Sequence, residues 1–120
     1  MKSLIAFFEI PVTDFCQSVN FYQAIFGVEL MMAEYGQEKM ACFVQDGQTV
    51  GALSYAPDFK PSEHGVLIHF HCEDMDRAIR QVLKQGGRIA IPKTKIQAEG
   101  KGHFAVFTDP AGNRIGLYAD

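Results

Sequence analysis

Histidines and carboxylates within apolar runs are the side chains of this 120-residue sequence that could carry chemistry. Glu9 lies in the run Leu4–Val12, and His69 and His71 lie in the run Val66–Cys72. Phe, Ile and Val favour strands, in which side chains alternate between two faces, so His69 and His71 share a face. A carboxylate near an imidazole in an apolar pocket could form an acid–base pair, with Glu9 and His69 as catalytic residues. Alternatively, the two side chains only satisfy each other's hydrogen bonds as a buried structural pair.

The spacing His69-x-His71 also occurs in metal sites, where two imidazoles project from one strand. Glu9 could supply a third ligand, and His103 is a more distant candidate. An ion held there would be zinc, nickel or another metal that accepts imidazole. This displaced metal site is the alternative to a chain that binds no metal.

A second group of candidates is apolar or aromatic and could line a ligand cavity. Methionine adapts its shape to varied apolar partners, although the same residues would serve equally well as ordinary core. Tyr55 is the member of this group that we include among the ligand-binding residues, together with His71 and His103. The group comprises Met31, Met32, Met40, Tyr35, Phe43 and Tyr55.

The elements that must position these residues occur twice in the chain. Residues 5–30 and 65–90 share an order of features in which Asp14 matches Asp74 and Gly27 matches Gly87. In each copy a strand-like run is followed by an Asp suited to cap a helix, apolar residues at helical spacing and a terminating glycine. The sequence therefore predicts an internal repeat with an offset of sixty residues near the start of each copy.

Three further strands are expected in each copy, so the prediction is an α+β fold of two βαβββ modules that form one eight-stranded domain. The modules span 1–58 and 64–120 of a single domain, 1–120, and Pro57–Ser62 is the linker between them. Asp46-Gly47 and Asp109–Asn113 are the hairpin turns that support this division. The predicted strands are Leu4–Val12, Val28–Ala33, Ala41–Gln45, Val50–Tyr55, Val66–Cys72, Arg88–Lys95, His103–Thr108 and Ile115–Tyr118.

Two signatures resemble one known family. The opening Phe8–Asp14, with Asn20-Phe21-Tyr22 and Phe26-Gly27, and the closing Phe107–Leu117 are similar to glyoxalase and bleomycin-resistance relatives. These proteins form the vicinal-oxygen-chelate superfamily, which also includes extradiol dioxygenases. The resemblance implies a glyoxalase-like fold in which each half forms a cup-shaped sheet around a ligand cavity.

In metal-dependent relatives, the resemblance places four ligands on four strands. The matching positions here are Phe7, Leu67, Gly51 or Ala52, and Gly116, none of which can ligate a cation. We therefore expect Phe7 and Leu67 to be apolar walls of a ligand site, and we expect no metal and no other cofactor.

Composition limits the partners. A formal net charge of −3, a pI near 5.7 and scattered basic residues argue against nucleic-acid binding. No apolar run approaches the roughly 20 residues of a membrane-spanning helix. Three widely spaced cysteines, interpreted as small buried residues, favour a reduced compartment, so a cytoplasmic location is expected. The resemblance implies a homodimer.

The function that these observations favour is a glyoxalase/bleomycin-resistance-like protein whose cavity binds a small apolar or carbonyl compound without the usual metal centre. The alternative is a lyase or isomerase that uses Glu9 and His69, with or without a displaced metal, on a small carbonyl substrate. A third possibility is a regulatory or association module, which no long interaction segment supports. The sequence leaves open the ligand, and whether the cavity closes within one chain or between two.

Overall fold

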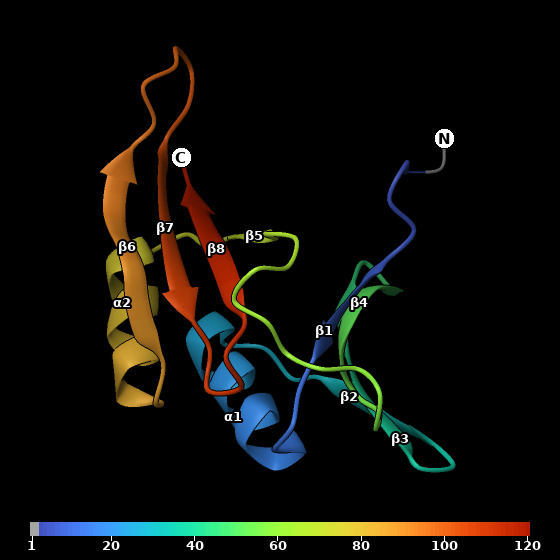
Figure 1. Cartoon of the computed structure of the whole chain (residues 1–120). Helices are drawn as coiled ribbons and strands as arrows, with labels where there is room; N and C mark the ends of the chain where they lie inside the picture. The colour runs from blue at the N-terminus through green and yellow to red at the C-terminus, as the bar shows by residue number, and fades with distance from the viewer. Residues whose placement is uncertain (1–2) are drawn as a thin grey trace.

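The computed structural model describes residues 3–120 and contains two four-stranded sheets with a helix between them (Figure 1). One helix and four strands come from each half of the chain, which confirms the predicted pair of βαβββ modules. Residues 1 and 2 of the predicted first module lie outside the described residues. The elements are β1 (Phe8–Pro11), α1 (Phe15–Phe26), β2 (Met31–Tyr35), β3 (Glu38–Gln45), β4 (Gln48–Tyr55), β5 (His69–His71), α2 (Met75–Lys84), β6 (Arg88–Lys95), β7 (His103–Thr108) and β8 (Arg114–Ala119).

Both helices begin at the predicted aspartates. The carboxylate of Asp14 accepts a hydrogen bond from the backbone N–H of Gln17 at 3.1 Å, and that of Asp74 accepts one from Arg77 at 3.0 Å. These side chains satisfy N–H groups that have no partner inside the helix. Gly27 ends α1 in the left-handed conformation, with φ of 63°, where a side chain would be strained.

The two sheets have the same topology. Their strand orders are β1-β4-β3-β2 and β5-β8-β7-β6, and the first two strands of each sheet are parallel. Glu9 pairs with Ala52 in the first sheet, and His69 pairs with Gly116 in the second. Glu9 and His69 therefore occupy equivalent places in the repeat, sixty residues apart as predicted.

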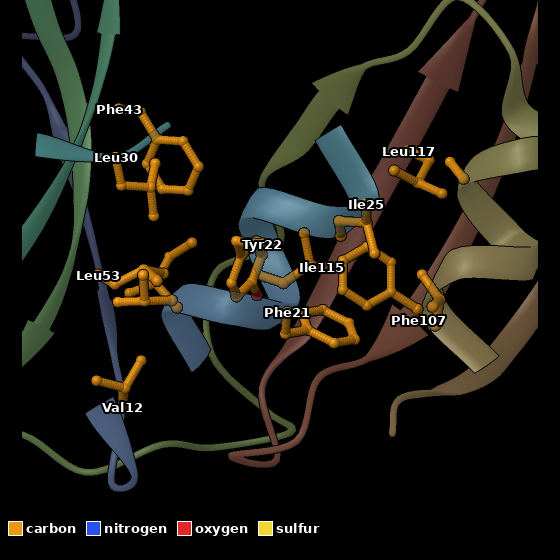
Figure 2. Packing of buried hydrophobic residues seen from close by; sticks show 14 of the residues in the cluster. Val12, Phe21, Tyr22, Ile25, Leu30, Phe43, Leu53, Phe107, Ile115 and Leu117 are labelled. Atoms are coloured by element: carbon orange, nitrogen blue, oxygen red, sulfur yellow. The ribbon is translucent and has the colours of Figure 1, made fainter. Parts of the chain in front are cut away.

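Helix α1 lies between the sheets and joins their cores. The Tyr22 ring contacts Phe43 of β3 and Phe107 of β7, with ring centroids 6.0 and 6.3 Å apart. Figure 2 shows these side chains converging on α1 from both sides. Ile10 and Phe70 also point into this core, so alternation places Glu9 and His69 on the opposite faces of their sheets, which we call the outer faces.

A polar network in the second module's hairpin turn fastens the modules together. The Tyr22 hydroxyl donates a 2.6 Å hydrogen bond to the buried Asp109 carboxylate, which also accepts from the backbone N–H groups of residues 111–113. The Asn113 amide donates to the Pro11 carbonyl of β1 at 2.7 Å. Burial, and then the neighbouring Asp109 charge, raise the pKa of Tyr22 well above its usual value.

Some predicted element boundaries were wrong. The strand predicted from Leu4 begins only at Phe8, and Leu4 is 99% exposed, because no neighbouring strand pairs with residues 4–7. The strand predicted over Val66–Cys72 is limited to His69–His71. Leu83 of α2, although apolar, is 57% exposed. No helix within residues 3–120 is long and apolar enough to cross a membrane.

Candidate functional site

Two hollows lie between the two modules. One cavity of about 540 Å³ adjoins α1 and α2, and another of about 1100 Å³ lies beside the start of β1. Both are lined by Gln45, Val50, Phe70 and His71, so we treat them as one intermodule cleft. Ligand cavities commonly measure roughly 300–1,000 Å³, so even the smaller part has room for a small organic molecule.

Phe70 of β5 is the centre of the cleft's aromatic lining. Its ring stacks on Phe26 of α1, with centroids 4.5 Å apart, and lies 5.3 Å from Phe43. Phe8 of β1 meets Phe70 edge-on at 5.6 Å. These rings come from both modules, and Phe70 lies on an edge strand of the second sheet. An apolar, polarizable surface of this kind favours flat apolar ligands.

Two of the predicted histidines border the cleft. His71 lines both of its parts, and His69 lines the larger part. The His71 ring meets Tyr118 edge-on at 5.4 Å. The His69 imidazole lies across Gly116, so closely that a Cβ added to Gly116 would fall 2.2 Å from Nδ1.

Glu9 lies elsewhere. Its carboxylate accepts a 2.8 Å hydrogen bond from the Ser54 hydroxyl and faces a separate cavity of about 280 Å³ beside the linker, which Arg114 also lines. Glu9 and His69 thus border different cavities of the chain. Their action as an acid–base pair stays a prediction. It requires the outer face of a first-module sheet, which carries Glu9, to lie opposite the outer face of a second-module sheet, which carries His69.

The remaining predicted ligand-binding residues are spread over the surface. Phe7 lies one residue before β1 and Leu67 two residues before β5, at positions sixty residues apart, and both are exposed. Tyr55 lines a shallow hollow beside α1 that also includes Lys39. His103 begins β7, opposite Ala119 of β8, outside the cleft lining.

The positions at which the family holds a metal do not suit one. Ala52 is 1% exposed and has no donor atom, while Gly116 is covered by His69. Phe7 and Leu67 have only hydrocarbon side chains. Among the residues that the structure describes, no three His, Cys, Asp or Glu side chains gather in a way that could hold a metal ion.

Several cleft residues were missed by sequence reasoning. Phe70 could have been found, because alternation places the residue between His69 and His71 on the core side. Glu29, Glu73 and Arg77 carry no signal in the sequence, since their convergence depends on how the two modules pack.

The prediction that all three cysteines are buried was wrong. Cys16 is exposed, whereas Cys42 and Cys72 are half-buried. Cys72 lines the cleft and donates a weak hydrogen bond to the Tyr118 carbonyl at 3.7 Å. Burial, with the Asp74 charge as a smaller cause, raises the pKa of the Cys72 thiol. At neutral pH this thiol is therefore protonated and a poor nucleophile.

The chain is similar to known proteins over almost its whole length. The sequence profile of the Glyoxalase/Bleomycin resistance protein/Dioxygenase superfamily matches residues 4–117. The anthracycline biosynthesis protein DnrV of Streptomyces peucetius is 28% identical over 127 positions, which cover 94% of this chain and 46% of that protein. DauV of Streptomyces sp. (strain C5), also an anthracycline biosynthesis protein, is 27% identical with the same coverage. The chain spans about half the length of these two relatives.

Solved structures share the fold. The fosfomycin resistance protein FosX from Listeria monocytogenes matches with a TM-score of 0.71 at 19% identity, over 100% of this chain and 93% of that one. A glyoxylase/bleomycin resistance protein/dioxygenase domain from Frankia sp. EAN1pec matches with a TM-score of 0.73 at 17% identity, over 99% and 98%. At these identities the likeness shows the fold alone.

Proposed function

The chain belongs to the Glyoxalase/Bleomycin resistance protein/Dioxygenase superfamily, and we propose that it binds a small apolar or carbonyl compound in the intermodule cleft without a metal centre. The aromatic lining around Phe70 is the observation that carries this proposal. Its rings offer a surface for a flat ligand, and His69 and His71 at the margin can hydrogen-bond a carbonyl oxygen. The similarity to two anthracycline biosynthesis proteins is consistent with an aromatic ligand.

The site residues support binding more directly than catalysis. Glu9 is held by Ser54 in one cavity, and His69 lies over Gly116 beside another. A lyase or isomerase that uses this pair therefore needs a second chain to bring the outer faces together. Exposed apolar side chains on the first sheet's outer face, such as Met31 and Tyr35, would be covered in such a homodimer. Light scattering that finds a monomer at micromolar concentrations would exclude both the homodimer and the shared site.

Fluorescence titration with two neutral planar probes tests binding in the cleft. Acridine presents only an aromatic surface, and acridone adds a carbonyl group. Val50 lies in both parts of the cleft and is 37% exposed, so Val50→Glu places a charge beside the ligand without opening the core. We expect this substitution to weaken binding of both probes at least tenfold, because an apolar ligand cannot compensate for desolvating the carboxylate.

Leu83→Glu is the matched control, since Leu83 is exposed on α2 and does not line the cleft. This variant should bind both probes as the unmodified chain does. The proposal fails if neither probe binds, or if Val50→Glu and Leu83→Glu bind them equally well.

A further inference from the structure

The two parts of the cleft differ in charge. The part that adjoins α2 is lined by the carboxylates of Glu29, Glu73 and Asp74 and by one guanidinium, that of Arg77. These three carboxylates and one guanidinium together have a formal charge of −2. Among residues 3–120, no Asp, Glu, Lys or Arg lines the larger part. Negative charge is thus confined to one end of the aromatic surface.

The carboxylates at this end are not equally available to a ligand. Asp74 already caps α2 by accepting from the Arg77 backbone N–H. Glu29 follows α1, and Glu73 follows β5, so the two side chains reach the cavity from different modules. Both residues are exposed, and the ion pairs within residues 3–120, Arg88–Glu63 and Lys93–Asp76, involve neither.

We propose that this end of the cleft selects a planar aromatic ligand that carries a positive charge, with Glu29 and Glu73 facing the cationic group while the rings lie against Phe70 and Phe26. The inference rests on the proposed function, because it assigns a charge to the ligand of the same cleft. A cation bound here gains attraction from two carboxylates and from the faces of aromatic rings. An anionic ligand of the same shape meets repulsion from the same groups.

The expected preference is modest because the carboxylates are exposed. A single exposed ion pair typically changes an equilibrium constant by about 1.5- to 5-fold. Two carboxylates acting together should therefore favour a cationic ligand over a neutral one of equal size by about five- to tenfold. Salt should remove most of this preference, since screening at about 1 M salt acts over roughly 3 Å.

A series of acridines separates charge from shape. Proflavine is a cation at neutral pH, acridine is neutral and acridine carboxylate is an anion, and all three have the same ring system. Fluorescence titration should show the tightest binding for proflavine and the weakest for the carboxylate. The double substitution Glu29→Gln with Glu73→Gln should weaken proflavine binding by about five- to tenfold and leave acridine binding unchanged.

Two further variants control for the change in net charge. Glu34→Gln with Glu38→Gln removes the same charge from β2 and β3, away from the cleft lining, and should leave all three affinities unchanged. Arg77→Gln removes the positive group of the cavity and should tighten proflavine binding by about two- to threefold. Loss of the carboxylates should weaken proflavine binding and loss of the guanidinium should tighten it. This pair of opposite changes is expected only if proflavine binds at the α2 end of the cleft.

The outcomes separate this inference from the proposed function. If acridine binds and Val50→Glu weakens it, but proflavine has no advantage that depends on Glu29 and Glu73, the cleft is a ligand site without charge selection and this inference is wrong. If acridine itself does not bind, the proposed function fails first. A proflavine advantage that persists in 1 M salt would also contradict the inference.

Discussion

Replacing Tyr22 with Phe tests the network that joins the two modules. The Tyr22 hydroxyl lies in the core and donates a 2.6 Å hydrogen bond to Oδ2 of Asp109, 87 positions along the chain. Phe retains the ring contacts with Phe43 and Phe107, so the substitution removes the hydrogen bond and little packing. Because Oδ2 still accepts from the Asn113 amide at 3.1 Å, the carboxylate keeps a partner.

The expected loss at pH 7 is about 2 kcal/mol, since hydrogen bonds to charged groups contribute roughly 1.5–3 kcal/mol. At roughly 2.1 cal/mol/K of unfolding entropy per residue, a domain of this size loses about 4 °C in Tm per kcal/mol. We therefore expect Tyr22→Phe to lower Tm by about 8 °C.

The pH dependence provides an independent check on the same contact. The folded-state pKa of Tyr22 is raised, so above pH 10 the unfolded chain releases this proton while the folded chain retains it. The folded state then binds more protons, and the free energy of unfolding falls as pH rises. By pH 10.5 this effect amounts to about 0.8 kcal/mol in the unmodified chain. Tyr22→Phe lacks it, so the difference between the two proteins should shrink by that amount.

Urea denaturation followed by circular dichroism at pH 7, 9 and 10.5 measures these quantities. Tyr35→Phe is the matched control, because Tyr35 is 65% exposed and its substitution should leave the free energy of unfolding unchanged at each pH. Equal stability of Tyr22→Phe and the unmodified chain at pH 7 would show that the hydrogen bond does not hold the modules together. A difference that stays constant up to pH 10.5 would refute the reasoning about the tyrosine proton.

Three further predictions concern close backbone contacts, thiol reactivity and helix capping. Gly102→Ala should destabilise the chain by about 3 kcal/mol in urea denaturation, because its Cβ would lie 2.0 Å from the Ala119 carbonyl oxygen; full stability would contradict this. In contrast, Cys16 should react with iodoacetamide much faster than Cys72, whose pKa is raised, and equal rates by mass spectrometry would refute the assignment. Asp74→Ala should cost about 1 kcal/mol by loss of the α2 cap, and an unchanged unfolding free energy would exclude that role.

The repeated fold could be predicted because its signals are local. Asp14 and Asp74 cap the helices, Gly27 ends α1, and the ranges of β6 and β7 agree with the predicted strands. The starts of β1 and β5 could not be predicted, because apolar residues before each strand resemble strand residues until a pairing partner is known. Leu4 illustrates this limit, since its side chain favours a strand but no neighbouring strand reaches it.

The site could be predicted only in part because it depends on how the modules pack. Alternation correctly put His69 and His71 on one face, which borders the cleft. It could not show that Glu9 and His69, although equivalent in the repeat, border different cavities. The pairing of Phe70 with Phe26 and the convergence of Glu29 with Glu73 join distant segments of the chain, and no local pattern encodes such contacts.

The equivalent strands β1 and β5 show how one backbone can hold two different sites. Their core-facing residues, Ile10 and Phe70, pack in the shared core, where an apolar side chain is favoured. Their outer-face residues, Glu9 and His69, are exposed and can differ in charge between the modules. The cleft uses the core-facing ring of Phe70, whereas any acid–base chemistry would use the outer faces. Substitutions at Val50 should therefore change ligand binding in the cleft without altering the surroundings of Glu9. Conversely, Glu9→Gln should leave ligand binding in the cleft unchanged, and it should remove any turnover that the outer faces support.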